Sequence, residues 1–528
     1  MGREARVSVP DDLLEVGPDV SQNSSGLPIS KIGDQGDKSY LLKLFRALKM
    51  RVCYEPAASI SESLVAISPA AGCLEDFPPI NHYEDLQFPL IQCASSRMDL
   101  IALLPPPQYL HRLKETYFRV SSPLFHIVHE ITFEEQYGVF CQDQNCVSLG
   151  WLALLYSILA MAVNALEDDD PILCDLSWEM SASKNIQVLS KRYLIAAQRC
   201  LSADGSMDEW SINSLQALLI TGFTKLHQGL PYWQLIGFTH YVAVSMGCHI
   251  DPKIFEFGEI KQEERRRAWA GLMVLHSVQS PFSGSLHQRI FMEDVNLPAD
   301  VDDIDLCVAN TQLYMTNHRA SSTDVPPTQM TFLLLSLHIH KITNMICESI
   351  LKYSPKPRFS ISELEAESIT VLEICNTRYQ PDPNNGPLHI QNQASIYILQ
   401  IKIRQLFLLL FTPSLCLFLQ GERSLEIWTI RSKCVFYAKS SLANFQTLHE
   451  SDYLSSYKWY TRGIGCFNAF QAAVVLAMNL FYPGDHVEFN ETIGILRHTV
   501  GIFDHLSTQS GLASRASHGI NNIMFVFF

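Results

Sequence analysis

The chain has 528 residues, of which 47% are hydrophobic and 18% charged, a globular composition that excludes a disordered regulator. With 39 Lys and Arg against 54 Asp and Glu, the net charge of −15 excludes a chain that as a whole wraps nucleic acid. Since a single hydrophobic core stops growing near about 250 to 300 residues, we expect two closely packed helical parts.

The 14 cysteines are scattered along the chain, which indicates reduced, mostly buried thiols in the cytosol or nucleus. No cysteine precedes Cys53, and no Cys-x2-Cys pair occurs in the sequence. The sequence therefore predicts no zinc site built from paired cysteines.

Residues 1–98 are expected to form an N-terminal arm and linker that is largely irregular. The first twenty residues are polar and acidic and lack the apolar segment of a signal peptide. Apolar and basic residues alternate over 38–51, which predicts a short basic helix. This helix is either an element for dimerisation, DNA-backbone contact or nuclear import, or a helix packed on the body with a solvated cationic face.

Residues 99–325 are predicted to form a helical core that begins with helices near 107–120, 151–166 and 184–201. The apolar run 151–166 is shorter than the roughly 18 to 20 residues that span a bilayer, so it is predicted to be a buried helix. A second apolar run, 406–419, is also short and is interrupted by Thr412-Pro413-Ser414. We therefore expect no membrane partner.

The stretch 213–306 has the clearest pattern. Apolar residues at helical spacing predict a helix over about 213–228, and Gly229 marks its end. A second helix is expected over 231–247, apolar on most of its circumference and therefore buried on more than one side. A third is expected from Glu263 to about Ser280, followed by an acidic turn at 297–303.

Arg265, Arg266 and Arg267 lie in one turn of that third helix and cannot all face the same way, so a single DNA-groove contact is not expected. Because Arg presents a planar fork that fits a carboxylate, we predict that Arg266 or Arg267 bonds to Asp302, Asp303 or Asp305 of the acidic turn. Glu263 and Arg267 are four residues apart and are expected to pair on the surface, for roughly 0.3 kcal/mol.

The order of these segments resembles the fungal-specific transcription factor domain, the regulatory middle homology region found downstream of zinc binuclear clusters. Upstream, Tyr117-Phe118, Pro123-Leu124-Phe125, His129 and Phe133 are similar to the opening of that domain. The central motif residues that carry the resemblance are Trp233, Gly237, Gly247, His249, Asp251, Pro252, Glu264, Arg265, Arg266, Arg267, Trp269, Leu297, Pro298, Asp302 and Asp303.

The resemblance implies an all-α protein, a large array of helices, that regulates transcription in the nucleus. Zinc is expected only in the family's N-terminal cluster, which this sequence cannot build, so no cofactor is expected in this chain. DNA would be contacted indirectly or through a missing domain. A homodimer, a co-regulator or a small-molecule effector are the partners that the family suggests.

Residues 326–528 are predicted to be a C-terminal helical region packed on the core. Helices are expected near 329–353, from Ser362 onward, and near 391–412, 424–449, 456–481 and 488–507. No strand-rich region and no repeat of 20 to 50 residues is found.

We do not predict an enzyme, because no phosphate-binding loop, dinucleotide fingerprint or nucleophile elbow occurs. His126 and His129 are three apart, whereas zinc hydrolases need histidines four apart on a helix, and His249 with Asp251 is more typical of turn chemistry. Trp233, Tyr241, Trp269 and His276 are the candidates for a ligand pocket, or else plain core residues. The alternative function is an enzyme or small-molecule binding protein on the same helical fold without DNA binding.

Overall fold

The structure is a computed structural model that describes residues 96–203, 210–230, 232–283, 295–308, 326–350, 359–380, 388–419, 421, 423–480 and 486–525. Every regular element in these ranges is helical, which confirms the predicted all-α class. The predicted basic helix at 38–51 lies outside the described residues, as does most of the arm 1–98.

Helix α6 is the centre of the N-terminal half, and every side chain from Gly150 to Val163 is buried. A helix that is apolar on all sides must be covered on all sides, as predicted for this run. The Ser148 side chain caps it by accepting from the Trp151 N–H at 3.1 Å. In chain order, the elements of this part are α3 (Arg97–Ile101), α4 (Pro107–Thr116), π-helical η4 (Tyr117–Ser121), η5 (Ser122–Leu124), α5 (Glu130–Gln142), α6 (Leu149–Asn164), α7 (Pro171–Leu176) and α8 (Ala182–Ala203).

The central stretch forms the helices that its periodicity predicts. The Ser211 hydroxyl caps the first of them by accepting from the Ser214 N–H at 3.1 Å. Gly229 and Gly247 follow the ends of the first two helices with φ of 67° and 74°, a conformation that favours glycine. The elements are α9 (Ile212–His227), α10 (Trp233–Ser245), η6 (Pro252–Ile254), α11 (Glu259–Ser283) and α12 (Asp303–Val308).

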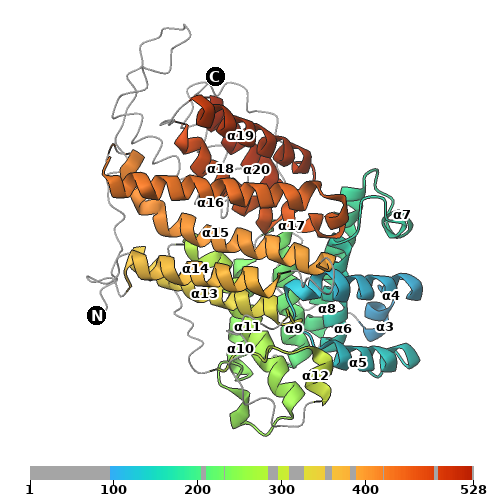
Figure 1. The fold of residues 1–528 in the computed structure, drawn as a ribbon. Coiled ribbons are helices and arrows are strands. Elements are labelled where there is room, and N and C mark those ends of the chain that lie inside the picture. The colour runs from blue at the N-terminus through green and yellow to red at the C-terminus, as the bar shows by residue number, and fades with distance from the viewer. Residues whose placement is uncertain are drawn as a thin grey trace, which may run out of the picture.

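The C-terminal half is a further series of packed helices (Figure 1). They are α13 (Thr331–Ile350), α14 (Ile361–Arg378), α15 (Ile390–Leu419), α16 (Leu425–Glu450), η9 (Asp452–Tyr457), α17 (Lys458–Arg462), α18 (Ile464–Asn479), α19 (His486–Leu506) and α20 (Gly511–Met524). Among the described residues, five helices lie where none is predicted: α3, α5, α7, α12 and α20. Helices α3, α7 and α12 are short, the apolar residues of α5 follow no clear stripe, and the buried face of α20 consists largely of Ala, Ser and Gly, which give a weak hydrophobic signal.

Helix α15 continues through Pro413, so the predicted interruption at Thr412-Pro413-Ser414 is wrong. Neighbouring helices α13, α14, α16 and α18 pack along α15 and hold it helical despite the hydrogen bond that proline removes.

By length and composition alone, the segment Ile390–Phe418 of α15 could cross a membrane. Half of its most apolar 18-residue stretch is, however, buried against other helices.

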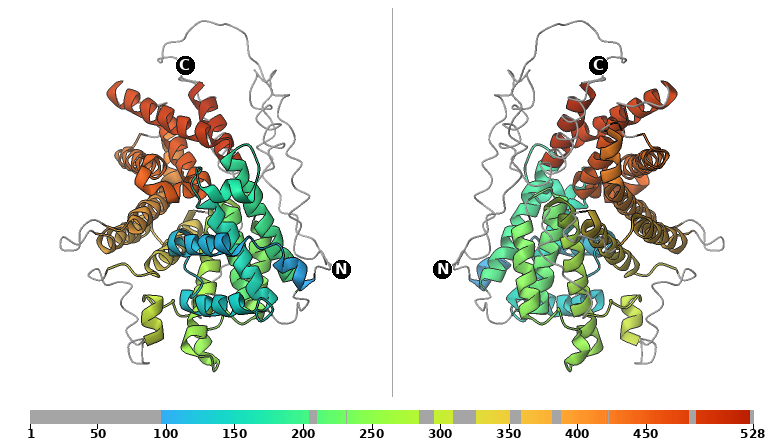
Figure 2. Two further views of the ribbon diagram at one scale, coloured as in Figure 1. Left: turned by 90° about the vertical axis from the view of Figure 1, so that its right-hand side faces the viewer. Right: turned by 90° about the vertical axis from the view of Figure 1, so that its left-hand side faces the viewer.

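Helix α13 joins the two halves of the molecule, because it packs against α11 on one side and α14 and α15 on the other. Figure 1 shows α13, α14, α15 and α16 stacked as successive layers beside the group of α6, α8 and α9. Figure 2 shows the same arrangement from the two sides, with the last helices, α19 and α20, at the opposite end of the molecule from α5. The predicted boundary at 326 therefore lies just before a helix that is shared by both halves.

Candidate functional site

The three arginines at the start of α11 have different partners, as their spacing predicts. Arg265 donates through Nη1 to the Met246 carbonyl at 2.8 Å and lies over the Phe257 ring. Arg266 donates through Nη2 to Asp251 Oδ1 at 3.0 Å. Only Arg267 points into the protein, where it is completely buried.

Arg267 bonds to the acidic segment that follows the central stretch. Its Nη1 donates to Asp303 Oδ1 at 2.6 Å, which confirms the predicted contact between the arginines and this segment. Its Nε donates to Glu263 Oε1 at 3.2 Å. The expectation that Glu263 and Arg267 pair on the surface is wrong, because the segment at 299–303 covers them: the Ala299 N–H also bonds to Glu263 Oε1, at 3.0 Å.

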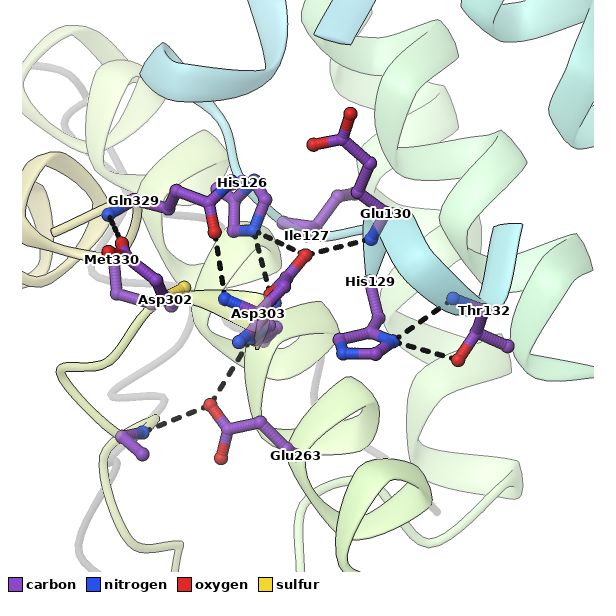
Figure 3. Close-up of polar contacts among 12 residues, drawn as sticks. His126, Ile127, His129, Glu130, Thr132, Glu263, Asp302, Asp303, Gln329 and Met330 are labelled. Atoms are coloured by element: carbon purple, nitrogen blue, oxygen red, sulfur yellow. Dashed lines mark hydrogen bonds and ion pairs between the residues drawn. The ribbon is translucent and has the colours of Figure 1, made fainter. Parts of the chain in front are cut away.

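Asp303 is the hub of this buried network (Figure 3). Besides Arg267, its carboxylate accepts from His126 Nε2 at 3.1 Å and from the Glu130 N–H at 2.8 Å. Its own N–H donates to Gln329 Oε1 at 2.8 Å. Burial alone would raise the pKa of Asp303, but the hydrogen bonds and charges of His126 and Arg267 hold it well below its usual range. The Asp303 carboxylate thus joins the loop before α5 to helix α11, and the Asp303 N–H bonds to the chain entering α13.

His126 is a neutral member of the network, since burial lowers the pKa of its imidazole despite the adjacent carboxylate. An ionised carboxylate only accepts hydrogen bonds, so His126 Nε2 carries the proton. His126 Nδ1 is then an acceptor for the Ser122 hydroxyl, 2.9 Å away. This assignment satisfies both ring nitrogens inside the protein.

Ser122, His126 and Asp303 are connected like a hydrolytic triad, but with the roles of the two ring nitrogens exchanged. Ser122 is only 2% exposed and His126 1%. The carboxylate is also shared with Arg267. Because the serine is buried and its hydroxyl, the imidazole and the carboxylate are hydrogen-bonded to one another, the arrangement holds the fold together and is not suited to nucleophilic catalysis.

The other acidic residues of this segment bond to the beginning of α13. Asp302 Oδ1 accepts from the Gln329 N–H at 2.8 Å, and Asp300 Oδ1 from the Thr328 hydroxyl at 2.6 Å. Asp300 Oδ2 also pairs with Arg378 Nη2 of α14 at 3.0 Å. Asp305 is exposed. The segment predicted as an acidic turn is therefore a connector, and Asp303 itself begins α12.

Asp251 shows the turn chemistry that the sequence predicts. It accepts from the N–H groups of Lys253 and Asn296, both at 2.9 Å, and pairs with Arg266. Burial would raise the pKa of this carboxyl, but these partners lower it to about 2. Pro252 is buried at the start of η6, and His249 is part-buried with its ring 6.4 Å from that of Trp269.

The remaining motif residues occupy different environments. Glu264 is buried beside the network, whereas Gly237 is exposed on α10. Pro298 is buried, and its neighbour Leu297 is exposed.

The four candidate pocket residues do not share one enclosed environment. Trp233 is 51% exposed and Tyr241 66%, both on α10, whereas Trp269 of α11 is buried. His276 is part-buried. The His240 ring contacts both His276 and Trp269, with ring centres 5.5 and 5.8 Å away. The prediction that α10 is buried on more than one side is wrong, because its buried residues form one stripe. They are Leu235, Ile236, Thr239, Val242 and Ala243, and α9 and α11 are the described helices that pack closely against α10.

Sequence reasoning missed His126, Glu130 and Gln329 as partners of Asp303. His126 is 177 residues from Asp303 in the chain, and no spacing rule relates the two.

Within the described part of the chain, no group of three or more His, Cys, Asp or Glu side chains is arranged to hold a metal ion.

Residues 115–373 match the family described as fungal specific transcription factor domain. The matched residues run from the end of α4 into α14 and contain the whole Asp303 network. The chain therefore contains a fungal specific transcription factor domain at residues 115–373. The resemblance inferred from the motif residues is therefore confirmed.

Relatives with known designations are similar over part of the chain. An uncharacterized transcriptional regulatory protein of Schizosaccharomyces pombe is 25% identical over 332 residues, 60% of this chain and 39% of its own length. The fusarisetin A cluster transcription factor of a Fusarium species is 24% identical over 41% of this chain and 29% of its own length. The equisetin cluster transcription factor of Fusarium heterosporum is 24% identical over 41% of this chain. The chain thus spans less than half the length of these relatives.

Proposed function

We propose that this protein regulates transcription in the nucleus, with its fungal transcription factor domain modulating gene expression. The match of 115–373 to that family carries the proposal, and the designations of the relatives support it. DNA is contacted indirectly, or through a zinc cluster that this sequence does not contain. The net charge of −15 agrees with a helical body that does not itself follow the phosphate backbone.

The buried network supports a regulatory scaffold. Asp303 and Arg267 hold the loop before α5, helix α11 and the beginning of α13 in one arrangement. Because α13 also packs on α15, it connects the two halves through continuous contacts, and we expect a change at either half to affect the other through this helix. A homodimer, a co-regulator or a small-molecule effector would act through this coupled body.

The proposal is tested by tethering the full chain to a heterologous DNA-binding domain in a fungal host. The reporter carries the cognate operator upstream of a promoter of intermediate strength, so that activation and repression are both visible. We expect reporter transcription to change relative to the DNA-binding domain alone. A fluorescent fusion of the untethered chain is expected to accumulate in the nucleus.

The test variant is Asp303→Asn in the same fusion, which disturbs the network at a side chain that is only 2% exposed. We expect it to reduce the regulatory effect at equal protein level. A wild-type fusion that is abundant and nuclear yet leaves reporter transcription unchanged would contradict the proposed function.

A further inference from the structure

Helix α14 has an apolar edge that faces α16 and is open to solvent. Both helices pack against α15 (Figure 1), and the Lys433 ammonium of α16 pairs with the Glu365 carboxylate of α14. Ile361 and Ile369 lie four residues before and after Glu365, on the same side of the helix. They are 50% and 38% exposed. The ion pair thus lies between two exposed isoleucines.

Helix α16 contributes the other half of this surface. Leu425, Thr429, Ser432 and Phe436 follow one stripe of the helix, and all four are exposed. Leu425 is 85% exposed and Phe436 64%. The Phe436 ring is supported by Tyr437, with ring centres 5.5 Å apart. Two large apolar side chains of α16 are therefore presented to solvent from a firmly packed helix.

Two sets of contacts fix the register of α14 and α16. Glu365 pairs with Lys433, and eleven residues farther along each helix Asn376 and Asn444 are both bonded to Gln400 of α15, each at 2.8 Å. The two helices therefore run in the same direction, which places Ile369 level with Tyr437 and beside Phe436. Ile361, Ile369, Leu425 and Phe436 thus form one continuous apolar patch, here called the α14–α16 surface.

The rim of the α14–α16 surface is acidic. Helix α14 exposes Glu363 and Glu373, and Glu367 is part-buried. Glu426 is exposed in the first turn of α16. Arg378, the one Lys or Arg in the sequence of α14, is only 3% exposed. Charge complementarity therefore favours a partner that combines an apolar stripe with Lys and Arg.

The segment 38–51 of the same chain has this chemistry. Leu41, Leu44, Phe45 and Leu48 have the spacing of one helical stripe, and the segment contains five Lys or Arg and no Asp or Glu. The 44 residues of 52–95 separate it from the first described helix. Fully extended they reach about 145 Å, against a radius of gyration of about 24 Å for a compact chain of this length. The linker therefore allows the segment to reach any face of the body.

We propose that segment 38–51 binds as an amphipathic helix to the α14–α16 surface of its own molecule. Its leucines and Phe45 would pack on Ile361, Ile369, Leu425 and Phe436, and its basic residues would pair with the glutamates of the rim. The linker raises the effective concentration of the segment to the millimolar range, so a weak contact is sufficient. The contact is independent of whether the protein regulates transcription.

The outer face of α10 is the competing apolar surface, but it lacks the charge. Trp233 and Tyr241 are exposed on this helix, and its sequence contains no Asp, Glu, Lys or Arg. An uncharged face offers no carboxylate to a basic helix and cannot select it over other apolar segments. The α14–α16 surface offers both kinds of contact.

Photo-crosslinking of the purified full chain tests the contact. Phe436→benzoylphenylalanine places a photoreactive group on the α14–α16 surface, and mass spectrometry identifies the peptide to which it attaches. We expect products within 38–51. In a mixture of unlabelled and ¹⁵N-labelled chains, both peptides of each product should carry the same label. Tyr241→benzoylphenylalanine on α10 is the matched control and is expected to give few such products.

Charge reversal tests how the segment is recognised. Glu373→Lys with Glu426→Lys is expected to lower the crosslinking yield about tenfold, as is Lys43→Glu with Arg46→Glu, because like charges would then meet. All four substitutions together should restore most of the yield, since the charges are complementary again.

Four results would overturn the proposal. They are products that mainly join differently labelled chains, a yield no higher than in the α10 control, an unchanged yield after either charge reversal, and no recovery when the two reversals are combined.

Discussion

Arg267 and Asp303 are 36 residues apart in the chain, yet Arg267 Nη1 lies 2.6 Å from Asp303 Oδ1. Arg267 is fully buried, and Asp303 is 2% exposed. A buried ion pair adds little net stability compared with apolar residues of equal volume, but removal of one partner leaves the other charge uncompensated. The relationship therefore fixes the position of the acidic segment on α11 more than it raises total stability.

The first prediction concerns this pair. Arg267→Met and Asp303→Asn are each expected to lower the free energy of unfolding, Arg267→Met by about 3 to 5 kcal/mol because Asp303 and Glu263 lose their cation. In the double variant the losses should be less than additive, with a coupling of about 1 to 3 kcal/mol. Urea denaturation of the wild type, the two single variants and the double variant measures this coupling energy.

A double-mutant cycle on Lys439 and Glu491 gives the matched surface control, because this pair is more exposed. Its coupling is expected to stay below about 1 kcal/mol. Additive losses in the Arg267 and Asp303 cycle would show that the two residues are stabilised independently.

The second prediction concerns Glu264, a buried neighbour of the network. Burial raises the pKa of Glu264 to about 7, although Arg267 partly opposes the rise. The folded state therefore binds a proton that the unfolded chain, with a pKa near about 4.3, has already lost. This contribution to stability is present below pH 4 and is lost as the pH rises through 7.

Replacement of Glu264 by Gln removes that titration. We expect the stability of Glu264→Gln relative to the wild type to increase by on the order of 2 to 3 kcal/mol between pH 5 and pH 8. Parallel urea denaturation of both proteins at several pH values measures the difference. A difference that is constant across this range would show that Glu264 titrates normally in the folded protein.

Much of the fold follows from local sequence, but the centre of the site does not. The period of apolar residues predicts α6, α9 and α11, and charge complementarity predicts the contact of Arg267 with the acidic segment. The burial of Glu263 could not be predicted, because Ala299 covers it from a distant part of the chain. The exposure of Trp233 likewise depends on which helices happen to cover α10.

His126 illustrates the same limit at the level of chemistry. The spacing of His126 and His129 does not show which groups their rings contact, and only the folded chain brings Ser122 and Asp303 to the two ring nitrogens of His126. The continuation of α15 through Pro413 is a similar case, since packing of neighbouring helices outweighs local preference.

The third prediction separates a regulator from a hydrolase. Because Ser122 is buried and its hydroxyl is bonded to His126, a fluorophosphonate probe should not label it in the native protein. Ser122→Ala is expected to cost about 1 kcal/mol of stability through the lost hydrogen bond, with the reporter effect retained. Mass spectrometry of the treated chain makes the measurement, and stoichiometric labelling at Ser122 would favour the enzymatic alternative.

The last prediction uses two glycines in neighbouring helices. A Cβ added at Gly271 of α11 would lie 2.7 Å from Ile127 Cγ2 and 3.1 Å from Phe125 Cζ, so the loop that holds His126 would have to move. We expect Gly271→Ala to destabilise the protein by about 1 to 3 kcal/mol through overpacking. Gly237 of α10 has no atom within 4 Å of the added carbon, so Gly237→Ala should stabilise by up to about 1 kcal/mol, as alanine favours helix. Urea denaturation compares the free energies of unfolding of the two variants with that of the wild type. Equal stabilisation by both substitutions would show that the loop holding His126 accommodates a methyl group at no cost and is not held rigidly against α11.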